Sequence, residues 1–162
     1  DEAQKWTVEL PASEQAQAHA WLSFTHIEHM GTVPLMVVAA DRPHGISDLP
    51  AWTDRLRHSS EILASIAHSI GPRRMLIAGD FQAPSSAQPL SRPLLGAGLQ
   101  AVNTPPSWPT RLGPFPFLAQ HAVDQVWAGK SWHAQRARVL PAGEQTRAPI
   151  IVDLSPVETP AG

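Results

Sequence analysis

The chain has 162 residues, of which 43% are hydrophobic and 16% are charged, so it can bury a core of its own as one domain. Its 12 Lys and Arg nearly match its 14 Asp and Glu, so a surface that binds nucleic acid is not expected. No Cys is present, which excludes disulfides and thiolate metal sites. The sequence contains no transmembrane run, and its first ten residues lack the basic and apolar regions of a signal peptide. We expect any membrane anchor or export signal to lie outside this chain.

The first forty residues predict three strands. Residues 5–10 form a short strand closed by Pro11, residues 20–29 alternate in strand fashion after a polar loop or helical turn, and 30–32 make a hairpin turn. The run "VPLMVVAAD" at 33–41 is almost continuously apolar. Such a run is typical of an interior strand buried on both faces of a sheet.

A helix and further strands follow a loop at 42–50. Apolar residues recur at helical spacing from Trp52 to Ile70, and Gly71 and Pro72 end the pattern. The other predicted elements are a strand at 73–80, a short helix around Pro93–Gly96, a Pro-rich loop, and strands at 118–129, 132–141 and 148–154. The expected fold is α+β, a layered mixed β-sheet with few helices, in one domain over 1–154 with a flexible tail at 155–162.

The predicted strand "RRMLIAGD" ends with the carboxylate of Asp80, and the carboxamide of Gln82 follows two residues later in Gly79-Asp80-Phe81-Gln82. Alone, this tetrapeptide indicates an ordinary turn in which a carboxylate accepts hydrogen bonds from local amides. The histidines of "HIEH" (26–29) do not suggest a metal site, since residues 26 and 29 of a strand point to opposite faces.

Several stretches together resemble a known family. "RRMLIAGDFQA", "SWP", "HAVDQVWAG" and "RAPIIVDL", in this order and spacing, resemble the second half of the endonuclease/exonuclease/phosphatase superfamily of metal-dependent phosphoesterases. The resemblance implies the two-layered fold of that family, with no counterpart here of its N-terminal metal-binding half. The nearest likeness is to actinobacterial members that follow membrane-spanning segments, which favours the extracytoplasmic face of a bacterial membrane and a membrane-tethered parent protein.

The resemblance also implies roles for individual residues. Asp80 would position and polarise the attacking water, and Gln82 stands where the family has an Asn that stabilises phosphoryl oxygens. Asp124 would orient a catalytic His, and Trp108 would line the cleft. Gln82 is one methylene longer than Asn, and a displacement of about 1 Å in a preorganised site costs roughly a hundredfold in rate.

Three further family positions are altered in this chain. Asp41 and Thr146 stand where the family has histidines, and Gln145 stands where it has a metal-binding Asp. A Thr hydroxyl cannot titrate near neutral pH as imidazole does, and a carboxamide is a poor substitute for a carboxylate around Mg²⁺. The sequence therefore predicts a degenerate active site that holds no metal and needs no cofactor.

Three functional hypotheses remain at this stage. The first is a catalytically degenerate binding or scaffold module, and the second is a divergent Mg²⁺-dependent phosphoester hydrolase that keeps Asp80 and Asp124 together with Asp41 or Glu144. The third is a half-domain that pairs with a protein partner or a missing half through an open sheet. For Asp124, a simple ion pair with Arg138 or Arg147 is an equally good interpretation of its presence.

Overall fold

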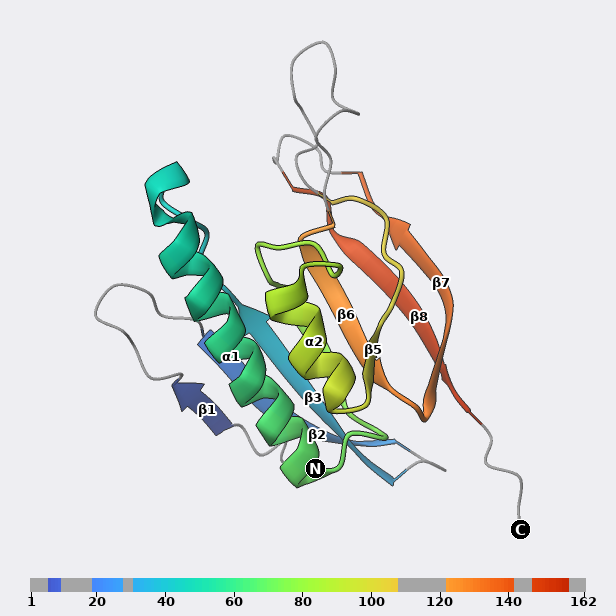
Figure 1. Ribbon diagram of the computed structural model, residues 1–162. Helices are drawn as coiled ribbons and strands as arrows, with labels where there is room; N and C mark the ends of the chain where they lie inside the picture. Colours follow the sequence, from blue (N-terminus) through green and yellow to red (C-terminus); the bar gives the residue numbers. More distant parts are fainter. Residues whose placement is uncertain (1–5, 10–18, 28–30, 108–121, 142–146, 158–162) are drawn as a thin grey trace.

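The computed structural model describes residues 6–9, 19–27, 31–107, 122–141 and 147–157, and shows an α+β fold (Figure 1). A sheet of six strands has the order β1-β2-β3-β4-β6-β5, and β7 and β8 form a second sheet. The strands are β1 (Trp6–Glu9), β2 (His19–Ile27), β3 (Gly31–Ala39), β4 (Leu76–Asp80), β5 (Leu99–Ala101), β6 (Asp124–Gly129), β7 (Trp132–Val139) and β8 (Ile150–Pro156). The helices are α1 (Leu49–Ile70), α2 (Gln88–Gly96) and a short 3₁₀ turn, η1 (Ile46–Asp48).

Strand β4 lies in the middle of the mixed sheet. It runs parallel to β3, to which α1 connects it, and antiparallel to β6. The pairing places Ala39 beside Asp80 and Asp80 beside Asp124. The carboxyl end of β4 therefore meets the amino end of β6, and two carboxylates come to one edge of the sheet.

Both helices cover the same face of the sheet, as Figure 1 shows. Side chains of α1 and α2 pack there against strand residues in one continuous core: Leu56, Leu63, Ala67, Leu90 and Leu94 from the helices, and Leu22, Met36, Val38, Ile77 and Trp127 from the sheet. Burying a large apolar side chain contributes about 1.5–3 kcal/mol. This helix-covered face is therefore the main source of the fold's stability.

The opposite face of the sheet is less well covered, and the predicted burial of residues 33–41 on both faces holds there for Val33, which is 2% exposed, but not for Val37. The strand is interior in the sheet order, but Val37 is 41% exposed while its neighbour Val38 is 4% exposed. Val37 lies in a row across the strands with Trp21, Ala78 and Val126. An apolar run predicts burial on both faces, whereas the helices cover only one. We call the row Val37, Ala78 and Val126 the open face.

The predicted elements are found in the predicted order, with shifted limits. Helix α1 starts at Leu49 rather than at Trp52. Pro50 is compatible with this earlier start, because a backbone N–H in the first turn would have no partner within the helix. Helix α2 starts at Gln88, and β5 was not predicted. The predicted strand over 118–129 begins at Asp124, the last strand extends to Pro156, and β2 starts one residue earlier than predicted, at His19. Residues 158–162 of the predicted tail lie outside the described residues.

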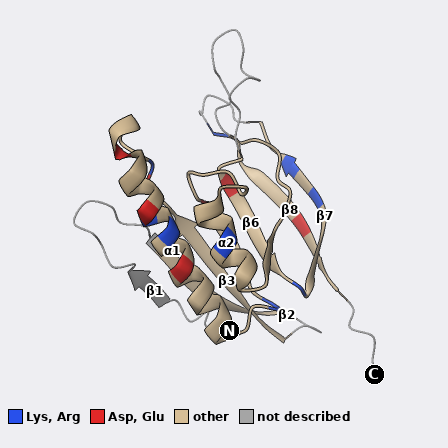
Figure 2. Ribbon diagram, viewed as in Figure 1, with Lys and Arg blue, Asp and Glu red and all other residues tan. Residues whose placement is uncertain are grey.

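Charged residues are spread over the described part of the chain (Figure 2). Helix α1 carries both signs, with Arg55 paired to Asp48 and Arg57 paired to Asp54. Within the described ranges, neither helix has the length and apolar character needed to span a bilayer.

Candidate functional site

Gly79 allows β4 to approach β3 closely just before the site. Its φ is +151°, and a Cβ at this position would stand 1.9 Å from the carbonyl oxygen of Val38. No side chain fits in that space, so glycine is required for the pairing of Val38 with Gly79. The close approach fixes the position of the next residue, Asp80.

The Asp80 carboxylate forms a local turn with Gln82. The backbone N–H of Gln82 donates to Oδ1 of Asp80 over 3.1 Å, and the Gln82 carboxamide donates to Oδ2. Gln82 has a φ of 55°, in the left-handed region that few residues other than glycine adopt. The ordinary turn carboxylate that the tetrapeptide alone predicts is therefore present.

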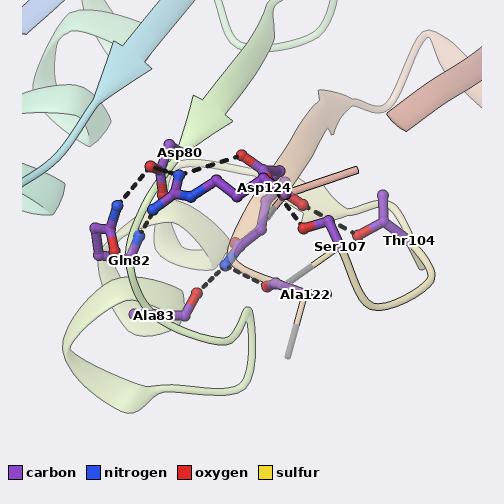
Figure 3. Close-up of polar contacts among 9 residues, drawn as sticks. Asp80, Gln82, Ala83, Thr104, Ser107, Ala122 and Asp124 are labelled. Atoms are coloured by element: carbon purple, nitrogen blue, oxygen red, sulfur yellow. Dashed lines mark hydrogen bonds and ion pairs between the residues drawn. The ribbon is translucent and has the colours of Figure 1, made fainter. Parts of the chain in front are cut away.

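Asp124 lies opposite Asp80 and has polar partners from the segment after β5 (Figure 3). Ser107 donates its hydroxyl to Oδ2 of Asp124 over 2.6 Å, and Thr104 donates to the Asp124 backbone carbonyl over 3.4 Å. Figure 3 shows Asp80 and Gln82 on one side of this cluster and Asp124 with Ser107 on the other.

Arg147 brings a positive charge to both carboxylates. Its Nη1 donates to Oδ2 of Asp80 and lies 4.0 Å from Oδ1 of Asp124. The predicted ion pair between Asp124 and Arg147 is thus confirmed, whereas Arg138 is an exposed residue of β7. The Arg147 side chain is 35% exposed and that of Asp80 is 22% exposed. Partial desolvation makes such a pair stronger than a surface ion pair.

Gln125, next to Asp124, has a structural role. Its side chain is buried, donates from Nε2 to the carbonyl of Ala83, and accepts from the indole N–H of Trp127 over 2.9 Å. These bonds satisfy the buried Trp127 and attach the turn after β4 to β6. Gln125 therefore holds the two halves of the polar cluster in register.

A hollow of about 430 Å³ opens beside the cluster. Polar and apolar groups line it: Gly79, Thr104, Asp124 and Arg147, together with Ala78, Gln125, Val126, Ala148, Pro149 and Ile150. Val126 and Ala78 also belong to the open face, so the hollow and the open face are continuous.

Asp80, Gln82 and Asp124 are the predicted site residues that the structure brings together. Asp41 is exposed, and its backbone carbonyl accepts a hydrogen bond from the Trp52 indole. Trp108, Gln145 and Thr146 lie outside the described residues. Their predicted roles stay predictions.

The described residues of this cluster do not fit a Mg²⁺ ion. Such an ion takes oxygen ligands in near-octahedral geometry, but the carboxylates of Asp80 and Asp124 already face donors from Gln82, Ser107 and Arg147. The group that lies between the two carboxylates is itself a cation. Within the described ranges, no three His, Asp or Glu residues converge as a set of metal ligands.

Known structures share this arrangement of strands and helices. An endonuclease/exonuclease/phosphatase from Beutenbergia cavernae superposes with a TM-score of 0.74 over 96% of this chain, at 13% identity. The chain has the endonuclease/exonuclease/phosphatase fold. The catalytic domain of human Nocturnin matches 95% of the chain with a TM-score of 0.67 at 15% identity, and a mannosyl-6-phosphatase of Bacteroides thetaiotaomicron matches 95% with 0.64 at 13%.

The chain spans only part of these structures: 45% of the Beutenbergia protein, 59% of the Nocturnin domain and 66% of the mannosyl-6-phosphatase. No profile of a known protein family and no curated protein sequence matches it. The endonuclease/exonuclease/phosphatase fold is thus established by structure, as the resemblance of the sequence predicted.

Two residues of the site were not predicted as members of it. Ser107 stands in the "SWP" stretch, in which only Trp108 is predicted to line the cleft, and Thr104 lies in a Pro-rich segment without strand periodicity. Arg147 was considered only as a partner of Asp124, although its main partner is Asp80. Its place directly before a β-strand at the end of the family pattern was the available signal.

Proposed function

We propose that this chain is a catalytically degenerate domain of the phosphoesterase fold that acts as a binding or scaffold module. The internal contacts of its strand-end carboxylates support this. Oδ2 of Asp80 accepts from both Gln82 and Arg147, which occupies its two lone pairs, and Oδ1 accepts from the Gln82 backbone. Three of the four lone pairs of the Asp80 carboxylate are thus engaged by the protein, which leaves little of it for a water or a metal ion.

The hollow next to this cluster is the proposed binding site. Its walls combine the Asp124 carboxylate and the Arg147 guanidinium with apolar groups of Val126, Pro149 and Ile150. Binding sites commonly have such a composition, in which apolar walls provide contact area and a few polar groups fix orientation. A small polar ligand or a side chain of a protein partner fits this chemistry.

A hydrolysis assay tests the proposal. The purified chain is incubated with a chromogenic phosphomonoester, a chromogenic phosphodiester and mannose 6-phosphate, each with Mg²⁺ and with Mn²⁺. We expect no turnover above a blank without protein, and the same result for Asp80→Ala. Metal-dependent turnover that Asp80→Ala abolishes would contradict the proposal.

A divergent Mg²⁺-dependent phosphoester hydrolase is the second candidate, and it would require the metal ion to displace Arg147 from the two carboxylates. The meeting of Asp80, Gln82 and Asp124 at one edge of the sheet favours it, and one protein of the same fold is a mannosyl-6-phosphatase. The assay above separates the candidates, because only this one predicts turnover that requires both the metal and Asp80.

We also propose that a protein partner or a missing half-domain covers the open face. Val37 is 41% exposed on an interior strand and is continuous across the sheet with the half-buried Ala78 and Val126, and contiguous apolar surface favours a contact. Sedimentation velocity over a range of protein concentrations tests this. Self-association of the isolated chain that Val37→Asp weakens is expected, and a monomer at all concentrations that binds no hydrophobic dye would contradict it.

Nucleic acid is not proposed as a partner. Basic residues of the described part are spread over α1, α2, β7 and the segments that connect the elements (Figure 2), and this distribution does not favour such a partner. The extracytoplasmic location and the membrane-tethered parent stay predictions from the sequence.

A further inference from the structure

Arg147 holds a position in the polar cluster that has the chemistry of a cation site. A single nitrogen, Nη1, hydrogen-bonds Asp80 and lies 4.0 Å from Asp124. The two carboxylates come from different strands, β4 and β6, and stand opposite each other in the pairing register. Two like charges this close repel one another unless a positive charge lies between them.

We propose that Arg147 is the resident counterion of this site and that its guanidinium excludes divalent cations from the carboxylate pair. A guanidinium is always charged and presents several N–H donors in fixed directions. It can therefore offset one of the two negative charges of Asp80 and Asp124, and unlike a metal ion it cannot be released into solvent. Because Arg147 lines the hollow, its positive charge contributes to the local charge that a bound ligand would contact.

The remaining partners fit this role of Arg147. Ser107 and Gln82 both direct donors at the carboxylates, whereas a metal ion would need oxygen lone pairs directed at it. The amide of Gln82 contributes an N–H to Asp80, so this side chain supports a carboxylate that binds a guanidinium. Among the described residues, Gln82, Ser107 and Arg147 therefore all direct N–H or O–H donors at the two carboxylates.

This inference concerns the site of the proposed function, but its test is metal binding and not hydrolysis, so the two can fail separately. Mn²⁺ and Mg²⁺ are titrated calorimetrically into the wild-type chain and into Arg147→Met, which keeps an unbranched side chain of similar length without the charge. We expect no saturable binding to the wild type. Arg147→Met should bind Mn²⁺ with a dissociation constant of about 1 mM, at least about tenfold tighter than the wild type.

Matched variants identify the source of the effect. Arg147→Lys should exclude the metal as the wild type does, because it keeps the charge. Arg138→Met, which removes an exposed arginine of β7, should also leave the chain without a metal site. The double variant Asp80→Asn with Arg147→Met should lose the binding that Arg147→Met gained. Saturable, Asp80-dependent binding of either metal to the wild type would overturn the proposal, and so would a folded Arg147→Met that binds none.

A measurement on the wild-type chain keeps the proposal testable if Arg147→Met does not fold. The side-chain N–H signals of Arg147 are followed by NMR against those of Arg138. A guanidinium held by two carboxylates should rotate and exchange at least about tenfold more slowly than an exposed one. Equal exchange for Arg147 and Arg138 would show that no counterion is held in the site.

Discussion

The two faces of the six-stranded sheet differ in how much of the chain packs against them. On one face, α1 and α2 bury Met36, Val38 and Ile77 in a continuous apolar core. On the other, Val37 is exposed, and Ala78 and Val126 border a hollow that leads to the pair of Asp80 and Asp124. The fold therefore depends mainly on the helix-covered face.

This difference explains how a fold can persist while a site changes. The helix-covered face contributes about 1.5–3 kcal/mol for each large buried side chain, whereas the polar cluster only has to avoid leaving charges unpaired. In the proposed degenerate domain, the altered site would change the second requirement and leave the first intact. Arg147 meets the second requirement within the chain itself.

The largest loss of stability is expected at Gly79, where the backbones of β3 and β4 lie in close contact between the two faces of the sheet. Gly79→Ala should lower the free energy of unfolding by roughly 3 kcal/mol or more, because a Cβ would collide with the Val38 carbonyl at a φ that L residues avoid. Urea unfolding measures the change. Gly96→Ala is the control, since a Cβ there meets nothing within 4 Å and should change stability little. Equal values for both variants would contradict the described approach of β3 and β4.

An intermediate effect should separate the two faces directly. Val38→Ala and Val37→Ala remove the same atoms from adjacent residues of β3. We expect Val38→Ala to cost about 2 kcal/mol, because it removes buried apolar area and leaves a cavity, and Val37→Ala to cost less than about 1 kcal/mol. Urea unfolding of both variants gives the comparison. Similar costs would mean that the open face is as well packed as the helix-covered one.

The smallest effect concerns the start of α1. The backbone N–H of His44, and then the side chain of Arg55, hold the pKa of Asp48 below its usual range. A lowered folded-state pKa gives stability that is present above the unfolded pKa and is lost as the pH falls through the folded one. Asp48→Asn should therefore be slightly less stable than the wild type at neutral pH and equal to it in strong acid. Urea midpoints from pH 7 to pH 2 test this, and a difference that does not change with pH would contradict it.

Much of the fold could be predicted because local patterns determine it. The spacing from Leu56 to Ala67 gives α1 its apolar side, and the alternation in β2 gives a strand. Exposure of Val37 could not be predicted from the sequence, since an apolar run carries no information on what packs against its second face. Strand β5 has only three residues and depends on pairing with β6, so it left no periodic pattern.

The candidate site was predicted in part for a similar reason. Asp80, Gln82 and Asp124 sit at the ends of strands, where the order of elements suffices to bring them together. Arg147 lies 67 residues from Asp80 along the chain. Only the folded structure shows that its hydrogen bond goes to Asp80 rather than to Asp124.

The central place of β4 has a consequence for how the chain forms. Its two neighbours are distant in sequence, since Leu76 pairs with Leu35 on one side and with Ala128 on the other. Such long-range pairings form slowly. During synthesis, the β4 edge that faces β6 has no partner until residues 124–128 have left the ribosome. In that interval a hydrophobic strand with a free edge is exposed, so chaperone binding or aggregation is most expected for nascent chains that end between β4 and β6.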